Sequence, residues 1–176
     1  MVTRLSQQPT KGWRRRMSVQ TDNRATVERF WSALDDGPPR GEALEAWKDI
    51  FAEDAVWEMP FAPEPLADTV AGRHLIGHFI DWFFYSVPDL RIDSLTVHDT
   101  TDPELFILEL HGKATVTQTG KVYANTYCTH MRIRDGKVVL IREYFNPNVV
   151  VEAFGPDVIA EGMSAVMAAA GVGAAQ

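Results

Sequence analysis

The chain has 176 residues, of which 45% are hydrophobic and 23% are charged, and its formal net charge is -7. This length suits one domain with a substantial core, and the composition is that of an ordinary globular protein, not a disordered or fibrous one. Because an acidic chain repels nucleic acid and no stretch approaches the roughly 20 apolar residues of a membrane helix, we expect neither a nucleic-acid nor a membrane partner.

The first 21 residues form a polar segment, which we expect to be a flexible leader. It carries Arg14, Arg15 and Arg16 and lacks the apolar core of about 7 to 15 residues that a secretory signal needs. The single cysteine, Cys128, excludes an internal disulfide. We therefore expect a reducing, cytoplasmic location.

Motifs for metals and cofactors are absent from the sequence. Cysteine and histidine residues do not cluster at the spacing of a metal site, and there is no glycine-rich phosphate loop or dinucleotide fingerprint. The sequence also has no Gly-x-Ser-x-Gly turn for a nucleophilic serine. We therefore expect a small-molecule substrate that is handled without a metal or a cofactor.

The N-terminal half is expected to contain three helices. Apolar residues at helical spacing predict the first over about residues 23–35, after a cap at Thr21 or Asp22. A second, shorter helix is expected over about residues 42–50, and a third over about residues 74–85. Their inward-facing residues are Val27, Phe30, Trp31, Leu34, Leu44, Trp47, Phe51, Leu75, Ile76, Phe79, Ile80, Phe83 and Phe84.

The strands are expected mainly in the second half. A brief strand around residues 56–59 leads into a proline-rich loop, and turn signals then separate four strands over about residues 90–98, 104–117, 122–133 and 137–146. Asp135-Gly136 is a typical two-residue hairpin turn. Helices followed by an antiparallel meander indicate an α+β domain, with the helices packed on one face of a curved sheet. The segment 149–154 is expected to close one end of a pocket or to form a dimer contact.

One acidic residue is expected on the apolar face of the last strand. Alternation places Glu143 on the same side as Val139, Ile141 and Phe145. A carboxylate among apolar side chains loses hydration, so its pKa rises toward the range that suits a general base at neutral pH. The alternatives are a glutamate paired with a basic residue of a neighbouring strand, or one that faces water at a sheet edge.

The preceding strand offers two possible pocket faces. Tyr123, Asn125 and Tyr127 share one side, whereas Thr126, Cys128 and His130 share the other. The sequence does not choose between them. Trp57 and Phe61 lie beside the proline-rich loop, where they form either a hydrophobic pocket wall or ordinary core.

Several stretches, taken in order, resemble the SnoaL-like, ketosteroid-isomerase-like superfamily. They are Asn23 to Phe30, Phe51 to Val56, Gly72-Arg73, Val87-Pro88-Asp89, Thr101-Asp102-Pro103 and Asp135 to Asn146. The resemblance implies a cone-shaped, curved antiparallel sheet packed against about three N-terminal helices. It implies a domain over residues 22–155, with a tail over 156–176, and a homodimer whose pocket lies between sheet and helices.

Within this superfamily the chain is most similar to the phenazine-biosynthesis A/B proteins. That resemblance implies proton transfer by a glutamate of the final strand and a histidine of the third helix, which are Glu143 and His78 here. On a helical wheel His78 lies away from the centre of the apolar arc, on the side of His74 and Asp81. A surface position for His78 is therefore the alternative to a catalytic one.

The chain departs from the phenazine pattern in the second helix, where Ala46 and Trp47 stand in place of arginines that suit a substrate carboxylate. We therefore expect a cofactor-independent acid/base enzyme for a small cyclic or polyketide-like metabolite, which it isomerises, cyclises or condenses, with a phenazine-type reaction included. The alternatives are a non-catalytic binding or assembly module of the same fold and, more weakly, an epoxide hydrolase. The expected substrate-binding residues are Trp47, Trp57, Phe61, Trp82 and Tyr127.

Overall fold

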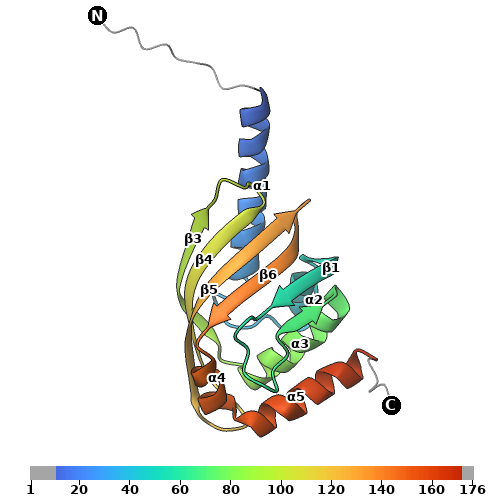
Figure 1. Cartoon of the computed structure of the whole chain (residues 1–176), viewed down its shortest axis with the longest axis vertical. Helices are drawn as coiled ribbons and strands as arrows, with labels where there is room; N and C mark the ends of the chain where they lie inside the picture. Colours follow the sequence, from blue (N-terminus) through green and yellow to red (C-terminus); the bar gives the residue numbers. More distant parts are fainter. Residues whose placement is uncertain (1–10, 172–176) are drawn as a thin grey trace, which may run out of the picture.

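The computed structural model describes residues 11–171, which fold into a curved sheet with helices on one side (Figure 1). The helices are α1 (Lys11–Ser32), α2 (Glu42–Lys48), α3 (Arg73–Ser86), α4 (Pro147–Phe154) and α5 (Pro156–Ala169). The strands are β1 (Phe51–Glu58), β2 (Thr69–Ala71), β3 (Arg91–Asp99), β4 (Leu105–Thr115), β5 (Val122–Arg134) and β6 (Lys137–Phe145). This arrangement confirms the predicted α+β class and the three N-terminal helices.

The six strands form one sheet in the order β2-β1-β6-β5-β4-β3. The predicted meander β3 to β6 is antiparallel, and the Asp135-Gly136 turn has both residues at positive φ, 51° and 72°. β1 is longer than expected and runs parallel to β6. The sequence contained no sign of that pairing, because turn signals report only contacts between strands that are neighbours in the chain.

The core lies between the helices and the inner face of the sheet. Burial alternates strictly along the middle of β5, where Tyr123, Asn125 and Tyr127 are buried and Thr126 and Cys128 are exposed. The structure therefore answers the question that the sequence left open, and it is the tyrosine face that meets the helices.

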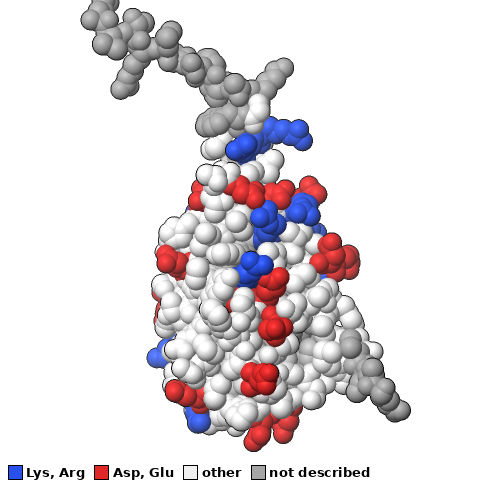
Figure 2. Space-filling view, viewed as in Figure 1, with Lys and Arg blue, Asp and Glu red and all other residues white. Residues whose placement is uncertain are grey.

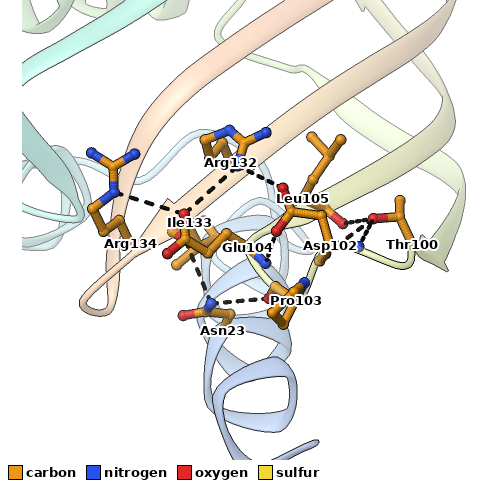
Figure 3. A network of polar contacts seen from close by, with 9 residues as sticks. All are labelled: Asn23, Thr100, Asp102, Pro103, Glu104, Leu105, Arg132, Ile133 and Arg134. Atoms are coloured by element: carbon orange, nitrogen blue, oxygen red, sulfur yellow. Dashed lines mark hydrogen bonds and ion pairs between the residues drawn. The ribbon is translucent and has the colours of Figure 1, made fainter. Parts of the chain in front are cut away.

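Helix α1 begins twelve residues earlier than predicted. Residues 11–21, expected to be part of a flexible leader, are helical, and these first turns project beyond the sheet in Figure 1; residues 1–10 lie outside the described part. The helix is fixed by Asn23, which is 4% exposed and donates through Nδ2 to the carbonyl oxygens of Pro103 at 3.1 Å and Ile133 at 3.4 Å (Figure 3). The prediction was wrong because these polar turns lack the apolar spacing on which it relied.

Helix α5 occupies much of the segment that was expected to be a tail. Its residues Ile159, Gly162 and Val166 are buried, and the helix packs against α3. A methyl group at Gly162 would collide with the indole of Trp82, so the glycine permits a close approach of the two helices. Residues 172–176 of the predicted tail lie outside the described part.

Charged side chains are interspersed on the face of the molecule that Figure 2 shows. Blue and red groups lie beside one another on this face, and wide areas around them carry no charge. Within residues 11–171, the structure contains no helix with the length and apolar character needed to cross a membrane.

Candidate functional site

A cavity of about 90 Å³ lies between the inner face of the sheet and the helices, and its wall is mostly aromatic. The described residues that line it are Phe30, Trp31, Leu34, Trp47, Trp57, Met59, Leu66, Phe79, Ile80, Trp82, Phe83, Phe84, Leu90, Ile92, Leu110, Gly112, Tyr123, Tyr127, Glu143, Phe145, Val150 and Phe154. The helix α4 contributes Val150 and Phe154, so the segment 149–154 does close part of the pocket, as one of its two predicted roles required.

Glu143 reaches this wall because β6 lies in the interior of the sheet, between β1 and β5. Register places Thr129 of β5 opposite Glu143, and it pairs Trp57 of β1 with Ile141 on β6. Since paired residues of neighbouring strands share a face, all four side chains are on the inner side. Glu143 is only 8% exposed, which confirms the predicted buried face.

Burial dominates the electrostatics of Glu143. Loss of water raises the pKa of its carboxyl to about 7, although the hydroxyl of Thr129 and the nearby indole of Trp57 oppose the rise. The Thr129 hydroxyl donates to Glu143 Oε1 at 3.3 Å. Glu143 forms no ion pair with any basic side chain in residues 11–171, so the alternative of a structural salt bridge is contradicted.

Two tyrosines of β5 add hydroxyl groups to the same wall. The hydroxyls of Tyr123 and Tyr127 are hydrogen-bonded to each other. Burial raises the pKa of both phenols, and the nearby charge of Glu143 raises each further, so both remain protonated at neutral pH. Because a pair of hydroxyls uses only one of its two protons internally, the other proton is available to a bound oxygen or nitrogen.

Four of the five predicted substrate-binding residues lie on the cavity wall, namely Trp47, Trp57, Trp82 and Tyr127. Phe61 does not, because it is 59% exposed and packs against Tyr144, with ring centroids 5.6 Å apart. Tyr144 alternates with the inward-facing Glu143 and therefore lies on the outer face of the sheet. The prediction for Phe61 was wrong because proximity to the loop does not determine the face that the side chain covers.

His78 is not brought together with Glu143. It lines a separate groove between α3 and α5, together with Asp81, Tyr85 and Glu161, and it is not among the described residues of the cavity wall. Its ring packs against that of His74, with centroids 4.7 Å apart. The expectation that His78 and Glu143 serve one substrate is corrected by this placement, and the surface position indicated by the helical wheel is the one observed.

Sequence reasoning missed three polar contributors to the cavity environment: Trp31, Tyr123 and Thr129. Trp31 was predicted only as part of a helical core face, and Tyr123 as one of two possible strand faces. Thr129 follows Tyr127 at a spacing of two and therefore shares its face, so alternation would have found it once the face was known.

Comparisons with known proteins agree with this geometry. A family model described as the SnoaL-like domain matches residues 27–141. An uncharacterized PhzA/B-like protein of Pseudomonas aeruginosa is 33% identical over 120 residues, which are 68% of this chain and 81% of that protein. These matches confirm the resemblance that the motifs indicated.

Solved structures agree on the fold. A phenazine biosynthesis-related protein of P. aeruginosa has a TM-score of 0.68 at 21% identity, covering 81% of this chain and 90% of that one. A Bacillus subtilis protein provisionally named an isomerase has a TM-score of 0.63 at 28% identity, covering 78% of this chain and 96% of that one. The cone-shaped fold is thereby confirmed.

Proposed function

Because the chain belongs to the SnoaL-like family, we propose that its cavity carries out a proton transfer without a cofactor and that Glu143 is the general base. The observation that carries this proposal is the burial of Glu143 in an aromatic wall with no basic partner among the described residues. A carboxylate whose pKa lies near the working pH is deprotonated often enough to accept a proton and basic enough to hold it.

The proposed step begins at a carbon next to a carbonyl or imine. Glu143 takes the proton, the electron pair of the broken C–H bond moves into the conjugated system, and the oxygen or nitrogen gains negative charge. The free hydroxyl proton of the Tyr123–Tyr127 pair stabilises that charge. Glu143 then returns its proton to another carbon, which completes an isomerisation. In a cyclisation or condensation the carbon that lost its proton instead attacks a second carbonyl; the C–C bond forms as the π bond of that carbonyl breaks, and its oxygen takes the proton from Glu143.

The substrate class that suits this site is a small cyclic or polyketide-like metabolite. The names of the relatives, which refer to phenazine biosynthesis and to an isomerase, lead us to include ring-forming steps of a phenazine type. His78 has no role in the proposed step, since it lines the groove between α3 and α5.

The proposal is tested with cyclohex-3-enone, a small neutral ketone whose double bond moves into conjugation when one proton is removed and another is returned. Wild type should accelerate formation of cyclohex-2-enone, followed by its ultraviolet absorbance. The Glu143→Gln variant keeps the shape but cannot accept the proton, so turnover should fall by at least about 100-fold. The rate should rise with pH through about 7, because only ionised Glu143 is a base.

Circular dichroism of the Glu143→Gln variant provides the control for folding. Equal turnover in a folded Glu143→Gln protein would remove Glu143 from the mechanism. His78→Gln is a matched control in a different pocket, and its turnover should equal that of wild type.

A non-catalytic binding module is the second candidate. It is favoured by one observation: within the described wall Glu143 is the only carboxylate, and no histidine accompanies it. Ligand binding to the cavity without acceleration of any proton transfer would support this candidate. An epoxide hydrolase would need an aspartate and an arginine in the cavity, and the described wall contains neither.

A further inference from the structure

The indole of Trp57 has a buried N–H group without a partner. Its Nε1 atom forms no hydrogen bond within the described part of the chain. The Nε1 atom of Trp31 shares this property, but it is not among the groups that affect Glu143. Because an indole nitrogen only donates and a buried donor without a partner is costly, an unused N–H of this kind calls for a functional explanation.

Strand β1 places this indole beside the proposed base. Trp57 is paired with Ile141 in the parallel register of β1 and β6, and Glu143 follows Ile141 on the same face of β6. Trp57 and Glu143 both line the cavity, and the indole is near enough to favour the ionised form of the carboxyl group. The N–H group is therefore next to the carboxyl group, and no hydrogen bond joins them in this structure.

The Trp57 ring is held in place by two other aromatic rings. Phe51 of the same strand stacks on it, with ring centroids 6.1 Å apart and an interplanar angle of 23°. Phe79 of α3 meets it edge to face, at 5.8 Å and 70°. Contacts from both β1 and α3 fix the direction of the N–H bond. A rotation of the Glu143 side chain toward the fixed indole is therefore the movement that would form a bond.

Ionisation of Glu143 changes what its carboxyl group can bind. The neutral group keeps an O–H donor, whereas the carboxylate only accepts and has about four lone-pair positions. The Thr129 hydroxyl fills one of these positions on Oε1, at 3.3 Å. Hydrogen bonds to an ionised acceptor are roughly twice as strong as those between neutral groups. A second donor therefore stabilises mainly the anion, and the described lining residues include no lysine, arginine or histidine to supply it.

We propose that the Trp57 indole N–H donates to the carboxylate of ionised Glu143, and that Trp57 is thereby a positioning residue for the base. Thr129 and Trp57 together fix the plane of the carboxylate from the protein side, which leaves its other lone pairs for a proton of the substrate. The inference rests on the proposed function for its catalytic meaning, but the bond itself is observable without a substrate.

Around neutral pH, Glu143 is the only described lining residue that changes its charge. The other titratable side chains of the described wall are Tyr123 and Tyr127 of β5, and burial raises the pKa of both phenols. The helices α1, α2, α3 and α4 contribute only uncharged side chains to that wall. The two histidines of α3, His74 and His78, stack on each other outside it. A change at Trp57 near neutral pH therefore reports on Glu143.

The test follows the indole protons by nuclear magnetic resonance while the pH is raised from about 5 to about 9. In wild type the Trp57 indole proton should move downfield with a midpoint of about 7, as a bond to an anion forms. In Glu143→Gln this titration should be absent. Trp47 is the matched control in the same wall, because its Nε1 already donates to the carbonyl oxygen of Phe30 at 2.7 Å, so its resonance should move far less.

The Trp57→Phe variant assigns the Trp57 resonance, because it removes that signal. If Trp57→Phe does not fold, nuclear Overhauser contacts to the rings of Phe51 and Phe79 assign it in wild type.

The pH profile of turnover is a second readout, which a purely structural role would not move. Loss of one hydrogen bond to the carboxylate lowers its ionised fraction at low pH. The ratio of turnover at about pH 9 to turnover at about pH 6 should therefore rise about fivefold in Trp57→Phe, the effect of one ordinary hydrogen bond. Trp47→Phe should leave this ratio unchanged.

Three outcomes would each overturn the inference: a Trp57 resonance that does not titrate, one that titrates equally in Glu143→Gln, or a Trp47 resonance that titrates with the same amplitude. An unchanged turnover ratio in folded Trp57→Phe would overturn the positioning role. A Trp57 titration that disappears in Glu143→Gln, together with unchanged turnover in that variant, would contradict the proposed base and leave the indole bond intact.

Discussion

Burial of Glu143 has a thermodynamic cost that depends on pH. An isolated glutamate titrates at about 4.5, whereas folding raises the pKa of Glu143 to about 7. Between these values the folded chain keeps a proton that the unfolded chain has released, so the free energy of unfolding falls as pH rises through this window. The property that suits a base is therefore also a source of instability above neutral pH.

Glu143→Gln should remove this dependence. From about pH 4 to about pH 8 wild type should lose about 3 kcal/mol more unfolding free energy than Glu143→Gln, following a pKa difference of about 2.5 units. Urea unfolding at both pH values measures the difference. Parallel pH profiles for the two proteins would show that Glu143 titrates normally in the folded state.

Thr129 opposes the rise in the pKa of Glu143, because its hydroxyl donates to the carboxylate. Thr129→Val keeps the shape and removes the donor, so the pKa of Glu143 should rise further and the pH-dependent loss of stability should continue to a higher pH. Thr126→Val on the exposed face of β5 is the matched control and should not move it. A lower pKa in Thr129→Val would contradict the assigned role of the hydroxyl.

The elements of this fold differ in how far local sequence specifies them. The apolar arc of α3 and the Asp135-Gly136 turn carry their signals within a few residues, and both were predicted. The early turns of α1 were missed because they are polar and lack apolar spacing; Asn23, which anchors α1 to the sheet, lies just after them (Figure 3). The helix α5 was missed because it depends on a tertiary contact, in which Gly162 lets it approach Trp82.

Two helical glycines of neighbouring elements make a paired test of this packing. A Cβ at Gly162 would overlap the indole of Trp82, so Gly162→Ala should destabilise the protein by about 1 to 3 kcal/mol through overpacking. A Cβ at Gly77 of α3 would meet only Lys48 Cδ, at an ordinary 3.6 Å, so Gly77→Ala should stabilise it by about 0.5 to 1 kcal/mol. Thermal denaturation measures both; a stabilising Gly162→Ala would contradict the close approach of α5.

At the scale of the whole molecule, the sequence predicted the cone and the burial of one acid but not the full site. Alternation along β6 was sufficient to find Glu143, since the signal lies within a single strand. The separation of His78 from Glu143 and the gathering of aromatic side chains from α1, α2, α3 and α4 depend on how elements are placed relative to one another. Periodicity within one element carries no information on that placement.

The homodimer implied by the family resemblance remains a prediction. Sedimentation velocity at micromolar concentration should give a species of twice the chain mass of 19.7 kDa. A single monomeric species under those conditions would contradict the prediction.

The parallel pairing of β1 with β6 joins Glu58 and Arg142, which lie 84 residues apart in the chain. Bringing such distant segments together requires closing a long loop, which is entropically costly and slows folding. Before this closure Trp57 of β1 does not cover Glu143, so we expect the pKa of its carboxyl to lie nearer the ordinary value. We therefore expect the proposed base to form only when the first and last strands have met.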